Sequence, residues 1–242
     1  MGTDKVNYNG HIFPDKGYTP IDWSKAKPFD FASDFAQWRK ANSKQDKAKP
    51  DFQILSAHYN NLLKKEYPEG ANVPQSFYKK VYDISNDLGS RNGKVINCDM
   101  EDLLAIMFNE SKFDSKLVSD NGKYAGLIQI DDTTYNSIFK NSSCNYEQFK
   151  KLPRGKQLSF IQEYFSYRIK TAGKGFDKYI DDKNGKISGG ALYTLVWRPG
   201  DFEKADDKKI AKNVRIKQNT INKINKNLEE INSYMQYFYP NT

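Results

Sequence analysis

The sequence is poor in the residues that bind zinc or build disulfide frameworks. Its 242 residues include two cysteines and two histidines. Cys98 and Cys144 lie 46 positions apart, and neither belongs to a Cys-x-x-Cys or Cys/His spacing. A zinc site would therefore lack ligands. The cysteines form either one disulfide or two ordinary thiols, and two buried thiols are the simpler interpretation. We expect neither a metal nor another cofactor.

Long apolar segments are missing as well. The longest uninterrupted apolar run, LLAIMF at 103–108, is far shorter than the roughly 18 residues that a transmembrane helix needs. We therefore expect no membrane span. The first residues, MGTDKVNYNGHIFPDKG, contain no apolar segment typical of a secretory signal peptide. Val6 stands where N-myristoylation requires serine or threonine, which argues against a lipid anchor.

Positive charge and aromatic rings, by contrast, are abundant. The formal net charge is +8 with an isoelectric point of about 9.1, and aromatic residues make up 14% of the chain. This aromatic content suffices for a packed core and argues against wholesale disorder. A basic chain favours polyanions such as nucleic acids, anionic membranes or acidic cell-wall polymers. Charge alone does not choose among them.

Apolar residues recur with helical spacing along most of the chain. Two helical patterns lie between 30 and 66, after an irregular arm, and further helices are expected over 75–88, 100–110, 132–139, 152–170, 191–197 and 203–235. Strand-like alternation is scarce, with at most a short β-hairpin in 117–130. We therefore predict a mostly α fold. Breaks in the pattern suggest an N-terminal arm with helices (1–70), a central domain (71–202) and a C-terminal amphipathic helical extension (203–242).

One glutamate stands on the apolar side of the helix expected over 100–110. Glu110 follows Leu103 by seven positions and Ile106 by four, which places it on their face. It also lies at the C-terminal end of the helix, where the partial negative charge disfavours a carboxylate. Desolvation and the helix end both raise the pKa of such a group, so Glu110 is a candidate proton donor. The alternative is a glutamate at a frayed helix end with its side chain in solvent.

The segment around Glu110, AIMFNESKFDSKLVSDNGKYAGLIQI at 105–130, resembles the signature of soluble lytic transglycosylases and goose-type lysozymes. In that family a glutamate–serine pair ends a helix, a serine follows nine residues after the glutamate, and a Gly-Leu-Met-Gln-like element comes next. The matching residues here are Glu110-Ser111, Ser119 and Gly126-Leu127-Ile128-Gln129. The stretch between Ser119 and Gly126 is one residue longer than the family pattern.

Two later segments resemble the muramidase domains of phage tail and virion proteins. LPRGKQLSFIQEYFS at 152–166 is similar to a helix in which a Gln-Leu pair precedes a Tyr-Phe pair. ALYTLVWRPG at 191–200 is similar to a segment whose tyrosine, here Tyr193, lies in the substrate cleft. The resemblance covers about 98–200. It implies a lysozyme-like helical bundle around a sugar-binding cleft.

The resemblance also implies roles for individual residues. Glu110 would be the general acid and base that cleaves the β-1,4 bond between N-acetylmuramic acid and N-acetylglucosamine. Four residues would contact substrate: Ser119, Gln129, Ile128 and Tyr193. Each also has a structural alternative. The serine could form a turn, the glutamine could cap loop backbone, and the other two could pack in the core. Tyr193 could instead orient Glu110. Ser111 is interpreted as a structural hydrogen-bonding residue.

A second catalytic carboxylate is not apparent from the sequence. The nearby candidates match no catalytic position of the family pattern: Asp114, Asp120, Asp131 and Asp132. Without a second acid, the family precedent is attack by the 6-hydroxyl of muramic acid, which yields an anhydro product. This favours a lytic transglycosylase, with a hydrolytic lysozyme on the same scaffold as the alternative.

Other interpretations remain open at this point. A virion or structural protein could keep the fold and bind cell wall without cleaving it. The Lys/Asn-rich segment from Lys204 to Lys226 could bind nucleic acid, but its acids and aliphatic stripe favour a helix packed on the domain. DDKNGKIS at 181–188 resembles the middle of a calcium loop but lacks both end ligands, so we interpret it as a polar turn followed by a cap at Ser188. The expected partners are peptidoglycan strands and phage virion or secretion-machine proteins, with action at the bacterial cell wall as a virion-associated or lysis protein.

Overall fold

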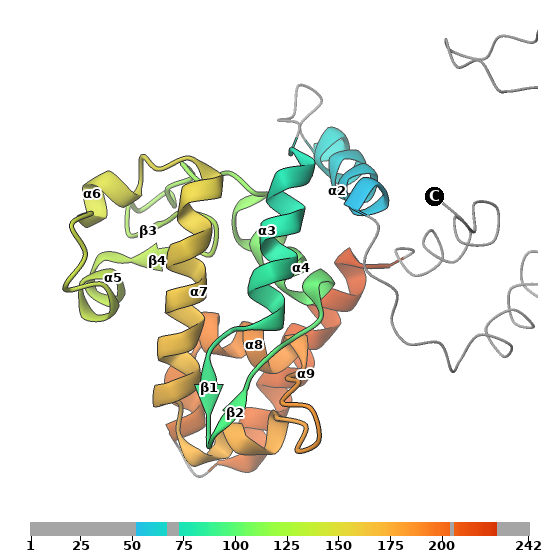
Figure 1. The fold of residues 1–242 in the computed structure, drawn as a ribbon, viewed down its shortest axis with the longest axis vertical. Coiled ribbons are helices and arrows are strands. Elements are labelled where there is room, and N and C mark those ends of the chain that lie inside the picture. The colour runs from blue at the N-terminus through green and yellow to red at the C-terminus, as the bar shows by residue number, and fades with distance from the viewer. Residues whose placement is uncertain (1–51, 67–72, 204–205, 227–242) are drawn as a thin grey trace, which may run out of the picture. The chain divides into compact units, whose positions relative to one another are not determined.

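The computed structural model of this protein describes residues 52–66, 73–203 and 206–226. The α-helices and 3₁₀ helices (η) are α2 (Phe52–Glu66), α3 (Gln75–Asn86), α4 (Met100–Ser111), α5 (Asp132–Ile138), α6 (Tyr146–Phe149), α7 (Arg154–Thr171), η1 (Lys174–Tyr179), α8 (Gly189–Trp197), η2 (Pro199–Glu203) and α9 (Asp207–Ile224). Two antiparallel hairpins pair β1 (Ser90–Arg91) with β2 (Lys94–Val95) and β3 (Tyr124–Ala125) with β4 (Ile130–Asp131). The mostly α prediction is confirmed (Figure 1). The irregular arm predicted at 1–29 and the helical pattern predicted before residue 52 lie outside the described residues.

The β1–β2 hairpin was not predicted. It contains two residue pairs, Ser90 with Val95 and Arg91 with Lys94, and two residues per strand are too few to produce an alternating pattern. The helix before it, α3, ends at Asn86 because Asp87 is extended and Gly89 has a φ of +117°. The second hairpin, β3–β4, coincides with the expected one and extends one residue beyond it.

The C-terminal helix is shorter than the expected 203–235. It begins after Asp206, whose side chain accepts a hydrogen bond from the Lys209 amide, and it ends at Ile224 with Asn225 as C-cap. Its apolar stripe is buried through Ile210, Val214 and Ile221. Residues 227–242 lie outside the described residues.

Two groups of aromatic rings fill the core. The first joins α2, α3 and α4 with the turn after α4 and consists of Tyr59, Phe77, Tyr78, Phe108 and Phe113. The second joins α5, α6 and α7 and consists of Tyr135, Phe139, Tyr146, Phe149 and Phe160. Both groups mix edge-on, tilted and stacked ring pairs, and aromatic quadrupoles favour the edge-on and offset-stacked arrangements. α4 contributes Phe108 to the first group, and α7 contributes Phe160 to the second.

The outer helices α2 and α9 share this core with residues 73–203. Tyr59 of α2 is fully buried, and its hydroxyl donates to the side chain of Asn225 over 2.9 Å. The His58 ring lies 3.2 Å from the carbonyl oxygen of Ile224. All described residues belong to one compact unit that begins at Pro50. One hydrophobic core contains buried side chains from both sides of the boundaries expected at 70/71 and 202/203, among them Leu55, Phe77 and Ile210.

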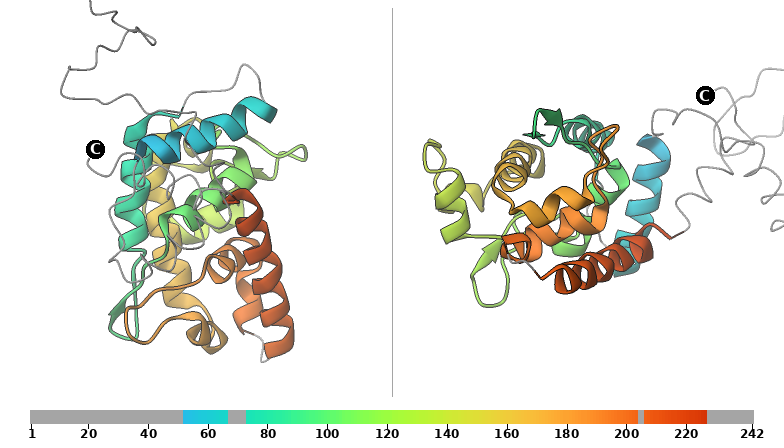
Figure 2. Two further views of the ribbon diagram at one scale, coloured as in Figure 1. Left: turned by 90° about the vertical axis from the view of Figure 1, so that its right-hand side faces the viewer. Right: turned by 90° about the horizontal axis from the view of Figure 1, so that it is seen from below.

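Two glycines allow α8 to pack closely against its neighbours. A Cβ on Gly189 would lie 2.5 Å from the carboxyl carbon of Asp102 in α4, and one on Gly190 would lie 2.4 Å from the carbonyl oxygen of Val214 in α9. Side chains at these positions would clash with both helices. α8 and α9 consequently lie side by side, as the views in Figure 2 show. Ser188 caps α8 as predicted, accepting from the Ala191 amide over 3.3 Å.

The cysteines, the 181–188 segment and the apolar helices were also subjects of predictions from the sequence. Cys98 and Cys144 are free, the first buried and the second partly exposed, so the disulfide alternative is wrong. Residues 181–186 form the polar turn that was expected, in which Asp181 and Asn184 accept hydrogen bonds from backbone amides two residues later. Within the described residues, no helix has the length and apolar character to cross a membrane.

Candidate active site

Glu110 lies in the last turn of α4, next to the point where the chain reverses. The helix ends because Lys112 and Phe113 adopt left-handed backbone conformations with φ values of +53° and +61°. The Ser111 hydroxyl lies 3.1 Å from the Met107 carbonyl oxygen and 3.0 Å from that of Leu127. These contacts confirm the structural role expected for Ser111. They also attach the end of α4 to the Gly-Leu-Ile-Gln segment.

The Glu110 carboxyl group is held by a tyrosine from α8. The hydroxyl of Tyr193 donates a short hydrogen bond to Oε1 of Glu110, and Nδ2 of Asn109 donates to the same hydroxyl over 2.5 Å. Tyr193 is fully buried, whereas Glu110 is half-buried. A buried phenol cannot present its ring to a sugar arriving from solvent. Of the two roles considered for Tyr193, the structure favours orienting Glu110.

Three further side chains lie around Tyr193: the indole ring of Trp197 at the end of α8, Arg198 directly after it, and Lys217 of α9. Nζ of Lys217 lies 4.0 Å from the centre of the Tyr193 ring and 4.3 Å from that of Trp197. The guanidinium carbon of Arg198 lies 4.3 Å from the centre of the Trp197 ring. These distances are those of cation–π interactions. None of the three residues was given a role from the sequence. Trp197 and Arg198 belong to the 191–200 segment, in which the resemblance assigns a role to the tyrosine alone, and no local pattern relates Lys217 of α9 to the end of α4.

The environment of Glu110 raises its pKa above the ordinary value of a glutamate. Burial raises the pKa of Glu110, while the hydrogen bond from Tyr193 and the positive charge of Lys217 act in the opposite direction without cancelling the increase. Burial also raises the pKa of Tyr193, and the negative charge of Glu110 adds to that effect. The Tyr193 hydroxyl therefore stays protonated and acts as donor. The pKa is shifted in the direction that the sequence predicts, with burial as the cause; the predicted contribution of the helix end is not among its causes.

The other residues that the resemblance assigns to substrate have contacts within the protein. The Ser119 hydroxyl donates to Asn121 over 2.8 Å and accepts from the Tyr124 amide over 2.9 Å, which closes the turn before β3. Nε2 of Gln129 donates to the carbonyl oxygens of Leu117 and Gly126. Ile128 is 1% exposed and belongs to the core. For all three, the structure favours the structural alternative.

Gln157, to which the sequence assigned no role beyond its Gln-Leu motif, holds the loop that follows α4. Oε1 of Gln157 accepts from the Leu127 amide over 3.0 Å, and Nε2 donates to the carbonyl oxygens of Ser115 and Phe149 over 2.7 and 3.0 Å. Gln157 is fully buried, and Gly126 (φ +81°) lies against it, where a Cβ would approach Oε1 to 2.7 Å. The Gln-Leu pair of the 152–166 segment thus connects α7 to the loop that follows Glu110.

The acids considered as partners of Glu110 have local roles in most cases. Asp131 caps α5, accepting from the amide and the hydroxyl of Thr134. Asp114 accepts from the Lys116 amide and Asp132 from the side chain of Asn136, while Asp120 is exposed. In the part of the chain that the structure describes, no group of three His, Cys, Asp or Glu side chains is arranged to hold a metal ion.

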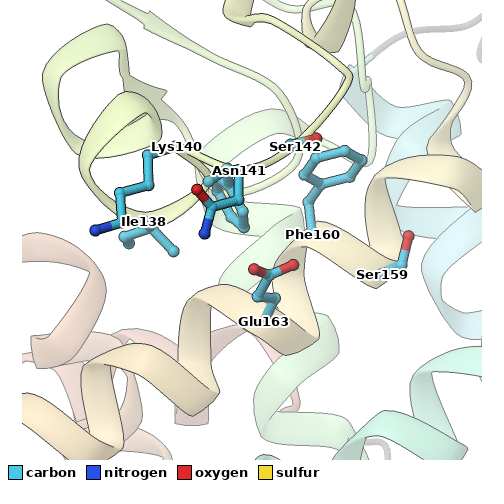
Figure 3. Close-up of a pocket in the computed structure, with 8 residues that line it drawn as sticks. Ile138, Lys140, Asn141, Ser142, Ser159, Phe160 and Glu163 are labelled. Atoms are coloured by element: carbon cyan, nitrogen blue, oxygen red, sulfur yellow. The ribbon is translucent and has the colours of Figure 1, made fainter.

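Two surface cavities lie away from this site. The first, of about 300 Å³, is lined by residues 138–142 and by Ser159, Phe160 and Glu163 of α7 (Figure 3). The second, of about 480 Å³, lies between α7 and the β1–β2 hairpin. Glu110 lines neither cavity. The sugar-binding cleft expected around Glu110 thus stays a prediction.

Protein-family models, curated proteins and solved structures yield no match to this chain. The similarity to muramidases therefore depends on the motifs at 105–130, 152–166 and 191–200 alone. Function has to be inferred from the chemistry of the residues around Glu110.

Proposed function

We propose that this protein is a peptidoglycan-cleaving muramidase in which Glu110 is the general acid and base. The observation that carries the proposal is the half-buried Glu110 carboxyl group, held by the Tyr193 hydroxyl at the end of α4. A structural glutamate at a helix end would extend into solvent, where its charge is hydrated at no cost. Fixing it against a buried phenol is the arrangement that a positioned proton donor requires.

The arrangement supports a defined sequence of proton transfers. The Tyr193 hydroxyl donates to Oε1, which leaves Oε2 of Glu110 to carry the proton that moves to the glycosidic oxygen. The bond to C1 of muramic acid then breaks, and C1 develops oxocarbenium character. The new Glu110 carboxylate is stabilised by Tyr193 and by the nearby charge of Lys217. It next accepts the proton of the attacking hydroxyl.

We propose the 6-hydroxyl of the same muramic acid as the attacking group. Attack on C1 closes an anhydro ring and returns the proton to Glu110, so that the reaction consumes no water. The capping role of Asp131 and the turn role of Asp114 favour this lytic transglycosylase route over a lysozyme route through a second carboxylate. The similarity to phage muramidase segments supports action on the cell wall from a virion or during lysis.

Digestion of purified peptidoglycan tests the proposal. Wild type is expected to release muropeptides with anhydro ends, which mass spectrometry recognises because they lack one water relative to reducing ends. Release of reducing ends would instead establish a hydrolytic lysozyme. Binding without release, across walls of several chemical types, would establish a silent cell-wall-binding protein.

Glu110→Gln is expected to lower turnover by about a hundredfold or more, because the amide cannot donate or accept the proton. The matched control is Glu163→Gln, an exposed glutamate of α7 on the cavity in Figure 3, which should leave turnover unchanged. Circular dichroism would verify that both variants are folded. Full activity in Glu110→Gln would remove Glu110 from the catalytic role.

A further inference from the structure

Lys217, whose positive charge acts on Glu110, lies close to a second cation, Arg198, to which the proton transfers give no role. Arg198 is exposed at the end of α8, and Lys217 reaches the same place from α9. Both lie over the ring of Trp197, which is 43% exposed. The three side chains therefore form one basic, partly aromatic surface beside the acid, called the Lys217–Arg198 subsite below.

Within the described residues, neither cation has a carboxylate oxygen within salt-bridge distance. Salt bridges within 4.0 Å occur elsewhere on the described surface, as between Lys186 and Asp99, but none involves Lys217 or Arg198. Glu110 is the acid whose charge attracts Lys217. In the protonated state that starts the reaction, Glu110 has no negative charge to offer.

Holding these cations together is electrostatically unfavourable. Burial lowers the pKa of Lys217, and the positive charge of Arg198 lowers it further. The aromatic faces of Tyr193 and Trp197 offset part of this cost. The C-terminal end of α8 also favours a cation at Arg198, but it does not account for the second cation from another helix. A bound anion would compensate both charges.

We propose that Lys217 and Arg198 form an anion-binding subsite that takes a carboxylate of the glycan substrate. The inference rests on the proposed function and names a recognition element for it. In peptidoglycan a carboxylate is carried by the lactyl ether of muramic acid or, where peptides are attached, by the stem peptide. Contact with either group would place the muramic acid next to Glu110 and would disfavour neutral glycans. Arginine and lysine are suited to such charge-assisted contacts.

Binding measurements in the Glu110→Gln background test the subsite without turnover. Three soluble tetrasaccharides serve as probes for calorimetry: neutral N-acetylglucosamine tetramer, a muramic-acid-containing tetrasaccharide with free lactyl carboxylates, and the same glycan with its peptides. We expect an anionic glycan to bind about tenfold more tightly than the neutral one. Of the two anionic probes, the one that binds more tightly identifies the ligand as the lactyl carboxylate or the peptide carboxylate.

Lys217→Met and Arg198→Met, each added to that background, are expected to abolish most of the preference, and Lys217→Arg to retain it. Lys212→Met removes the same charge from an exposed position of α9 and should leave the preference intact. Equal binding of neutral and anionic probes, or a preference that survives in both methionine variants, would overturn the subsite but not the enzyme. Failure to bind any of the three glycans would overturn the proposed function and the subsite together.

Discussion

At the scale of single residues, opposing forces act on the Glu110 carboxyl group. Burial favours the neutral acid, whereas the Tyr193 hydroxyl and the Lys217 charge favour the carboxylate. The balance leaves the pKa above that of an ordinary glutamate, which suits a group that must first donate a proton and then accept one. Because Tyr193 comes from α8 and Lys217 from α9, their two contributions can be removed separately.

Tyr193→Phe removes the hydrogen bond and keeps the ring. The bond stabilises the charged form, so its loss raises the pKa of Glu110, and the alkaline limb of the pH–activity profile should move to higher pH. We also expect turnover to fall by about tenfold, because the carboxyl group loses its orientation. The measurement is muropeptide release across pH for wild type and variant. The control is Tyr135→Phe. The Tyr135 hydroxyl donates to the Cys144 carbonyl oxygen in another part of the domain, so its loss should leave the pH–activity profile unchanged. An unchanged profile in Tyr193→Phe would contradict the role assigned to Tyr193.

At the scale of elements, the loop after α4 is positioned by two buried polar side chains. Ser111 attaches it to α4, and Gln157 attaches it to α7. These bonds satisfy backbone groups that would otherwise be buried without partners. The loop is thus held from the inside, while Ser119 and Gln129 complete its own hydrogen bonds.

Gln157→Leu measures how much the hydrogen bonds of Gln157 to the loop contribute to the stability of the protein. The substitution leaves two buried backbone groups unpaired, the Leu127 amide and the Ser115 carbonyl, and removes one of the two hydrogen bonds to the Phe149 carbonyl, which still accepts from the Leu152 amide. We expect the free energy of unfolding to fall by about 3 kcal/mol. Urea denaturation followed by circular dichroism measures the change. Gln162→Leu removes one exposed hydrogen bond from the same helix and should cost less than about 1 kcal/mol. Equal losses in both variants would show that Gln157 is not an anchor.

At the scale of the whole molecule, the C-terminal helix is part of the same core as the candidate site. α9 packs against α8 and contributes Lys217 to the surroundings of Glu110. Its buried contact includes Ile221, which approaches Gly189 at the start of α8. Stability and site geometry should therefore depend on α9 together.

Ile221→Ala tests this dependence. Loss of a fully buried isoleucine should lower the free energy of unfolding by about 3 kcal/mol. Ile216→Ala, on the exposed side of the same helix at 43% exposure, should change it by less than about 0.5 kcal/mol. Thermal unfolding of both variants should remain a single transition. A separate early transition in Ile221→Ala would show that α9 unfolds independently of the domain.

The sequence by itself determined the features that depend on local spacing. Helices α3, α4, α5, α7 and α8 follow from apolar residues at helical intervals, whereas the four-residue α6 was not predicted. The raised pKa of Glu110 follows from its place on the apolar side of α4, since burial is its cause. The free cysteines and the cap at Ser188 also follow from local chemistry and composition. Such properties require few contacts between distant parts of the chain.

Only the tertiary structure decided what surrounds Glu110. Tyr193 lies 83 positions along the chain from Glu110, and Lys217 comes from a further helix. The buried contacts of Gln157 and the turn role of Ser119 likewise depend on which backbone groups meet in the folded loop. Side chains far apart in sequence are brought together because α8 packs through Gly189 and Gly190 against α4 and α9, and close packing of this kind leaves no periodic pattern in the sequence.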